Sequence, residues 1–135
     1  MIKKHVKFTD YNGNEIEEDF YFNLTKAELT EMQFKANGAY SNFIERIMNE
    51  RDVARLGEEF KNLILNSYGV KSDDGRLFRK SAQIREEFEQ SAAYSELFME
   101  LITDADKAAK FVQGILPSDL QESANNATRG AIQAG

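Results

Sequence analysis

A strand pattern that runs directly into a helix signal constrains the fold of this chain more than any other feature. One parity of Glu15–Phe22 (EIEEDFYF) holds the apolar residues together with one carboxylate: Ile16, Glu18, Phe20 and Phe22. This alternation is the period of two that is expected of a half-buried strand. Thr25 follows, and Glu28 stands three residues later, which is the spacing of a capping box at the start of a helix. The first third of the chain therefore predicts a strand followed at once by a helix.

A second alternating segment, Ile2–Phe8, precedes this strand, and the turn segment 10–14 separates the two. The dipeptide Asn12-Gly13 within it is a strong hairpin signal. The two segments therefore predict an antiparallel β-hairpin over residues 2–22. A lone hairpin is only marginally stable in water, so its apolar face must rest on the helices that follow.

The outer faces of the two predicted strands carry opposite charges. Lys3 and Lys7 lie on one strand, and we expect them to lie opposite the acidic residues Glu17 and Asp19 on the other. Each cross-strand pair of this kind contributes about 0.2–1 kcal/mol. His5, the only histidine, lies between the lysines. A single histidine on a strand is typical of a surface residue rather than a catalytic base or a metal ligand.

Apolar residues recur at helical spacing through most of the remaining chain, and the stripes predict five or six short helices. The stripes run over Leu29–Ala36, Tyr40–Met48, Val53–Ile64, Ile84–Phe88, Tyr94–Ile102 and Ala105–Leu116. Asn37-Gly38 and Gly69 are predicted to end the first and the third of these helices. Ser81 and Asp104 are placed to cap the starts of two others. Between helices, Val70–Lys80 contains Asp74-Gly75 and predicts a tight turn or a miniature hairpin.

These elements predict an α+β fold that is mainly α-helical and forms one domain over residues 1–117. Its hairpin (2–22) packs on a bundle of five or six short helices (24–117). Pro117, the only proline, marks the end of the last helix. The remaining residues, 118–135, are mostly Asn, Ala, Ser, Gln and Gly, and they predict a flexible tail.

The composition argues against several classes of function. The chain has 135 residues, no cysteine and a formal charge of −6, so thiolate chemistry is excluded and the acidic surface disfavours nucleic acid. Its start, MIKKH, has no apolar segment after the charges, which predicts an intracellular protein with no membrane association. No catalytic, nucleotide-binding or metal-binding motif is present, so we expect no enzyme activity, no cofactor and no metal.

Three apolar residues fall outside the stripes of their helices: Phe34, Leu65 and Met99. One interpretation is that these helices are covered on two sides, as in any multi-helix domain. The other is that the three residues belong to an exposed apolar groove or a self-association surface, and they are our candidate protein-binding residues. Because methionine is flexible and polarizable, such a surface would tolerate varied helical partners.

Three segments of the chain resemble the tail assembly chaperones of long-tailed bacteriophages and prophages. They are DFYFNLTKAELTEM (19–32), LNSYGVKSDDGRLFRKS (65–81) and AYSELFMELITDADKAAKFVQGILP (93–117). No single segment is catalytic or distinctive alone, but they occur in the expected order and with similar spacing.

The resemblance implies a non-enzymatic protein of the bacterial host cytoplasm that binds the tape measure protein and keeps it soluble. Tail tube subunits would displace it as they polymerise, so it would be absent from the mature virion. The family also implies, as further partners, the tail tube protein and a longer frameshifted form of the same chain. Self-association is compatible with this role, because coating a long client requires many copies. One alternative function stays open: a structural head–tail connector or tail completion protein retained in the virion. A small enzyme or regulator is disfavoured by the residue content.

Overall fold

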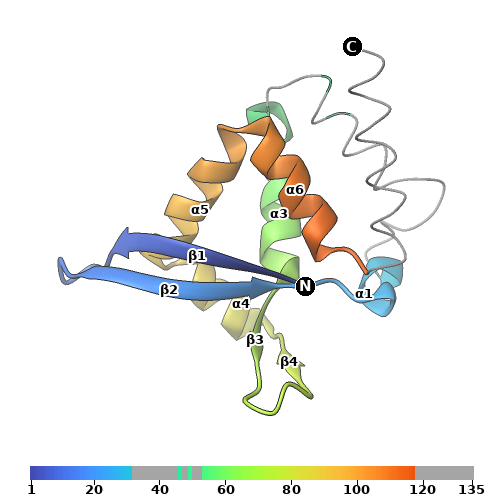
Figure 1. Ribbon diagram of the computed structural model, residues 1–135, viewed down its shortest axis with the longest axis horizontal. Coiled ribbons are helices and arrows are strands. Elements are labelled where there is room, and N and C mark those ends of the chain that lie inside the picture. Colours follow the sequence, from blue (N-terminus) through green and yellow to red (C-terminus); the bar gives the residue numbers. More distant parts are fainter. Residues whose placement is uncertain (32–45, 47–48, 50–52, 118–135) are drawn as a thin grey trace.

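The structure is a computed structural model that describes residues 1–31, 46, 49 and 53–117 (Figure 1). Phe34, the predicted helix end at Asn37-Gly38 and the predicted tail (118–135) lie outside the described residues. The predicted helix over Tyr40–Met48 also lies outside them, except for Arg46.

The N-terminal hairpin is confirmed. Strands β1 (Ile2–Thr9) and β2 (Glu15–Phe22) pair antiparallel along their whole length. The Asp10 carboxylate closes the turn by accepting hydrogen bonds from the backbone N–H groups of Asn12 and Asn14, at 2.9 and 2.8 Å. Gly13 has a φ of 85°, a left-handed conformation that glycine adopts without steric cost. The predicted Asn-Gly turn is thus formed, and it sets the register of the hairpin.

This register confirms one predicted charge pair and shows that the other was wrong. Lys7 lies opposite Glu17, with 3.6 Å between the ammonium and the carboxylate. Lys3, however, lies opposite Tyr21, and Asp19 lies opposite His5 instead. Loop residues 10–14 place Thr9 opposite Glu15, and every later pair follows from that start.

A second hairpin extends the sheet beyond what the sequence predicted. Strands β3 (Tyr68–Lys71) and β4 (Phe78–Arg79) pair with each other, which confirms the miniature hairpin. The sheet order is β1-β2-β3-β4, and β2 pairs with β3 at only two positions. Beyond that contact the hairpins diverge: β1 and β2 run to the left in Figure 1, and β3 and β4 run downward.

The described residues hold five α-helices and one 3₁₀ turn. The helices are α1 (Lys26–Glu31), α3 (Gly57–Ser67), α4 (Ala82–Glu89), α5 (Ala92–Ile102) and α6 (Ala105–Ile115), and η1 (Val53–Leu56) precedes α3. The capping box of α1 is formed, because the N–H of Thr25 donates to Glu28 Oε1 and the N–H of Glu28 donates to Thr25 Oγ1. Ser81 and Asp104 cap α4 and α6 as predicted.

The third helix ends next to the predicted Gly69, but this glycine does not form the cap. Helix α3 stops at Ser67 because Tyr68 turns to an extended conformation and pairs with Phe22. Gly69 therefore lies in β3, where a Cβ atom would stand 2.6 Å from the Phe78 ring. The role of Gly69 is therefore to let the Phe78 ring pack close to the backbone of β3.

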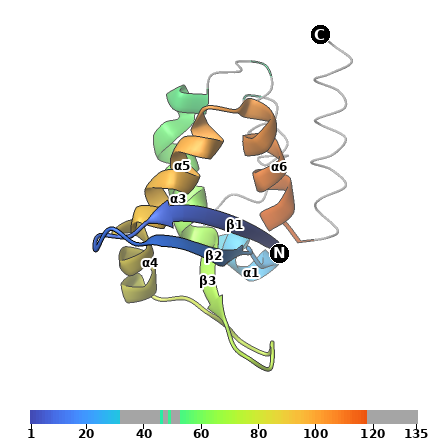
Figure 2. The same cartoon turned by 60° about the vertical axis from the view of Figure 1, so that its left-hand side comes forward.

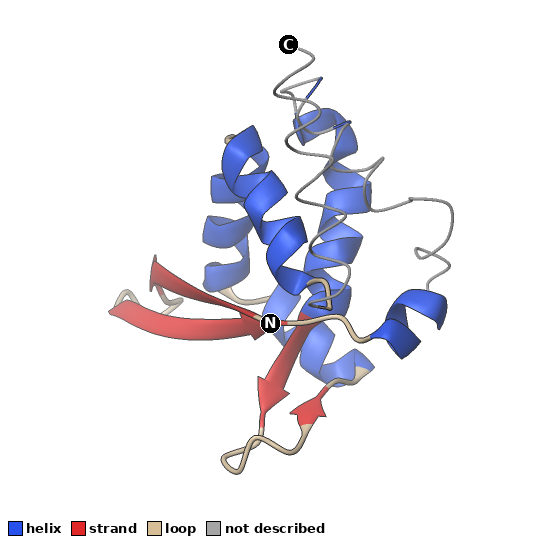
Figure 3. Ribbon diagram, turned by 45° about the vertical axis from the view of Figure 1, so that its right-hand side comes forward, coloured by secondary structure: helices blue, strands red, loops and turns tan. Residues whose placement is uncertain are grey.

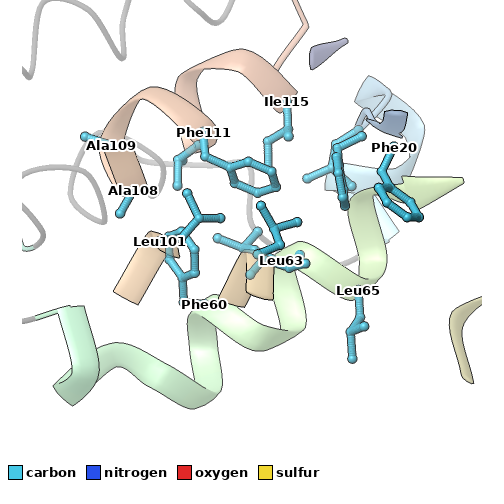
Figure 4. Packing of buried hydrophobic residues seen from close by; sticks show 14 of the residues in the cluster. Phe20, Phe60, Leu63, Leu65, Leu101, Ala108, Ala109, Phe111 and Ile115 are labelled. Carbon is cyan, nitrogen blue, oxygen red and sulfur yellow. The ribbon is translucent and has the colours of Figure 1, made fainter. Parts of the chain in front are cut away.

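The hydrophobic core lies between the hairpin and the helices. In Figures 1 and 2, α3, α5 and α6 lie on one side of the β1–β2 hairpin, and Figure 3 shows the strands gathered along one edge of the helical part. Phe60, Leu63, Leu101, Phe111 and Ile115 point toward one another between these three helices (Figure 4). Phe22 of β2 joins them, with its ring centroid 5.2 Å from that of Phe111. The mainly helical α+β architecture is therefore as predicted.

A partly buried ammonium group ties distant segments together. The Nζ of Lys80, whose side chain is 16% exposed, donates to the carbonyls of Asn23 and Asn66 at 2.7 and 2.9 Å. It also donates to the Glu28 carboxylate at 2.5 Å. Burial lowers the pKa of Lys80, while the hydrogen bond to Glu28 opposes that shift. Burial would raise the pKa of Glu28, but hydrogen bonds from Lys80 and the Thr25 backbone hold it below its usual range.

We expect Lys80→Met to lower the free energy of unfolding by about 2–4 kcal/mol, because it leaves a half-buried carboxylate and two carbonyls without their donor. Urea denaturation measures this. Lys110→Met, on the exposed face of α6, is the control and should change stability by less than about 0.5 kcal/mol. A loss below about 1 kcal/mol for Lys80→Met would contradict the role of this ammonium.

The His5 ring on the outer face of the hairpin should titrate above the ordinary range of a histidine. Hydrogen bonds to Glu17 and Asp19, at 3.1 and 2.7 Å, raise the pKa of His5 above the ordinary histidine value of 6.5. The hydrogen bond from His5, with Lys7 nearby, lowers the pKa of Glu17. Because the pKa of His5 is raised in the folded state, His5 contributes its full stabilisation below about pH 6.5 and loses it as the pH rises through the pKa of the folded state. Because the pKa of Glu17 is lowered in the folded state, Glu17 contributes its full stabilisation above about pH 4.3.

The hairpin should therefore be most stable at about pH 5–6. NMR titration of the His5 ring should give a pKa above 6.5 that falls in Asp19→Asn and Glu17→Gln. Glu15→Gln, on the same face of β2, is the control and should leave the His5 pKa close to the wild-type value. A wild-type pKa at or below 6.5 would refute the prediction.

Candidate protein-binding surface

Within the described ranges, the search for a functional site finds apolar surface rather than chemistry. No group of three His, Asp or Glu side chains there is arranged to hold a metal ion. No helix among the described residues is long and apolar enough to cross a membrane. Large apolar side chains are nevertheless exposed: Met1, Tyr11, Val70, Leu77 and Met99.

The three residues that the sequence singled out do not form one surface in the described structure. Phe34 lies outside the described residues. Leu65 is only 8% exposed and belongs to the core cluster, and it points away from Phe60 and Leu63 on the other side of α3 (Figure 4). Met99 is 51% exposed, on the side of α5 opposite the buried Leu97 and Leu101. Leu65 thus fits the two-sided packing interpretation, and Met99 alone remains an exposed candidate.

An apolar depression lies where the two hairpins diverge, and we call it the β2–α4 pocket. It has a volume of about 190 Å³. Its lining comes from both hairpins and from the facing parts of α4 and α5: Phe8, Glu18, Phe20, Tyr68, Val70, Ile84, Glu87, Phe88, Ser91 and Ala93. Because β3 leaves β2 after two residue pairs, this part of the sheet is open, and Glu18 and Val70 beside it are exposed.

Aromatic rings form the floor of the pocket. Tyr68 stacks on Phe88 with 4.1 Å between ring centroids and an interplanar angle of 13°. Phe20 lies 5.3 Å from Phe88, and Phe8 lies 6.3 Å from Phe20. Since Phe20 and Phe88 are buried and Tyr68 is half-buried, the floor is rigid at its base and accessible at its surface. Rings held in this way offer contact area with little loss of conformational freedom on binding.

Two carboxylates stand at the edge of these rings. Glu18 and Glu87 are exposed, and both act electrostatically on the Tyr68 hydroxyl. Burial is the main cause that raises the pKa of Tyr68, and the charges of Glu18 and Glu87 raise it further. No lysine or arginine of the described segments lines the pocket. The pocket is therefore apolar at its floor and negative at its rim.

Sequence analysis missed this pocket, although one signal pointed to it. Glu18 shares the parity of the buried residues Phe20 and Phe22. A carboxylate on the core face of a strand would be costly to bury if that face were fully covered, so its presence indicates that the face is partly open. The structure places Glu18 where the cover ends. The sequence could not predict that Tyr68 and Val70 line the pocket, because their position depends on β3 joining the sheet.

A second, more polar cavity lies beside the pocket and shares Phe8 with it. It has a volume of about 470 Å³ and lies between the end of the β1–β2 hairpin and Glu96 of α5. Its charged lining residues are Lys7, Glu15, Glu17 and Glu96. Negative charge therefore continues from the rim of the β2–α4 pocket along the hairpin.

Two substitutions test the different environments of the predicted residues. We expect Met99→Asp to fold normally, because the side chain is already half in solvent. Leu65→Asp should cost several kcal/mol, since it buries an unpaired carboxylate. Thermal melts of both variants, with circular dichroism to check folding, measure the difference. Equal melting temperatures for the two variants would contradict the burial of Leu65.

Comparison with known proteins agrees with the resemblance of the three sequence segments. No curated protein and no solved structure matches the chain. The sequence profile of a family described as phage tail assembly chaperone matches residues 1–134, a range that includes both hairpins, the described helices and the β2–α4 pocket. The chain therefore belongs to the phage tail assembly chaperone family.

Proposed function

We propose that this protein binds the phage tape measure protein in the bacterial cytoplasm and keeps it soluble until the tail tube polymerises. The observation that carries the proposal is the open aromatic floor of the β2–α4 pocket, in a protein of this family. A long client with exposed apolar stretches aggregates unless those stretches are covered. The apolar pocket would cover apolar stretches of the client, and the net charge of −6 on the chain would keep the complex soluble.

The action is non-enzymatic and reversible. The sequence contains no nucleotide-binding motif that would drive release by hydrolysis. Release then comes from competition, as tail tube subunits take over the client, and the chaperone stays out of the mature virion. A small pocket suits this role, because a limited contact area allows rapid dissociation.

Many copies along one client follow from the small size of the site. We infer that residues 1–117 form the binding domain and that residues 118–135 form a tail at which a longer frameshifted product would extend the chain. The tail tube protein and that longer product are the further partners we expect, and self-association on the client would add avidity.

Co-expression with the tape measure protein encoded beside it tests the proposal. We expect the client to become soluble and to co-elute with this chain, and the purified virion to lack the chain. A client that stays insoluble beside a well-folded chain, with or without the frameshifted long form, would refute the proposal. Stoichiometric amounts of the chain in purified virions would favour a structural connector instead.

The same experiment tests the pocket with a matched pair of variants. Val70 lines the pocket and is 44% exposed, while Leu77 is 52% exposed on the same hairpin and does not line it. Val70→Ser should lower the amount of client retained about three- to tenfold, because it removes apolar contact area. Leu77→Ser should retain the client as wild type does.

A further inference from the structure

We propose that the β2–α4 pocket recognises a basic amphipathic segment of the client, in which a large apolar side chain enters the pocket and a lysine or arginine one helical turn away meets Glu18 and Glu87. The identity of the client rests on the proposed function. The chemistry of the segment is inferred from the pocket itself.

The volume of the pocket sets the size of the anchor. A cavity of about 150 Å³ holds a benzene ring. The β2–α4 pocket, at about 190 Å³, therefore has room for one large side chain such as Phe, Leu or Met, and not for several. Binding would depend on one anchor for each chaperone copy.

The rim carboxylates select the charge beside the anchor. Most acidic groups of the hairpin already have partners: Glu17 contacts Lys7 and His5, and Asp19 contacts His5. Among the described residues, Glu18 makes no hydrogen bond or ion pair, and Glu87 accepts a hydrogen bond only from Gln83. Two carboxylates held beside an apolar floor without a cation are complementary to a ligand that supplies one.

Tyr68 adds a second element of recognition. Its ring is stacked on Phe88, and it lies within the electrostatic influence of both rim carboxylates. A cation that approaches Glu18 and Glu87 therefore passes close to an aromatic ring, where a cation–π contact is favourable. Residues three or four apart on a helix have Cβ atoms about 5–6 Å apart, so an anchor and a basic neighbour reach the floor and the rim together.

Two synthetic peptides of about 20 residues, long enough to form a helix, test the inference. Both carry the same Leu and Phe stripe, and the positions flanking the stripe are Lys in one peptide and Glu in the other. Fluorescence anisotropy with the full chain should show at least about tenfold tighter binding of the Lys peptide at low salt, with a ratio that falls as salt rises. Equal affinities for the two peptides, or no binding of the Lys peptide, would overturn the inference.

A charge-matched pair of double variants separates the pocket from the general acidity of the chain. Glu18→Gln/Glu87→Gln should remove most of the preference for the Lys peptide, since both rim charges are lost. Glu58→Gln/Glu86→Gln removes the same charge from exposed positions of α3 and α4 that do not line the pocket, and should preserve the preference. An equal loss in both variants would overturn the inference, because the net charge alone would then explain the selectivity.

Failure of the inference and failure of the proposed function give different results. If the tape measure protein co-purifies with the chain but the rim variant keeps its full preference, the function stands and the pocket inference is wrong. If the Lys peptide binds the rim as expected while the tape measure protein does not co-purify, the recognition chemistry stands and the proposed client is wrong.

Discussion

The short backbone segment after β2 is the point on which the rest of the structure depends. The N–H of Asn23 donates to the Ser67 carbonyl at the end of α3, and the N–H of Leu24 donates to the Ile115 carbonyl at the end of α6, each at 2.8 Å. Lys80 completes the junction through the Asn23 carbonyl. Buried backbone groups must be paired, so this segment fixes the hairpin, two helices and the second hairpin relative to one another.

The candidate site is a consequence of that junction. It aligns β2 with β3 for two residue pairs only, and the sheet then opens. Phe20 and Phe88 are buried below the opening, while Tyr68 and Val70 remain accessible at its edge. The stability of the core and the accessibility of the pocket thus come from the same geometry, in which tight pairing at one end leaves the other end uncovered.

Much of the fold was accessible from local sequence signals. The Asn12-Gly13 turn, the Thr25–Glu28 capping box and the caps at Ser81 and Asp104 all form as predicted, because each depends on residues a few positions apart. The site was less accessible. Glu18 gave a hint through its parity, but Leu65, chosen because it lies outside its stripe, is buried by packing on a second side of α3.

The sequence by itself determined the hairpin, the described helices and the family, since these follow from spacing and residue identity. Only the tertiary structure decided that Tyr68 leaves α3 to pair with Phe22, that Asp19 faces His5, and that Lys80 reaches three acceptors. Each of these is a contact between segments far apart in the chain. Local propensity carries no information about such contacts, because they depend on the way the whole chain closes around one core.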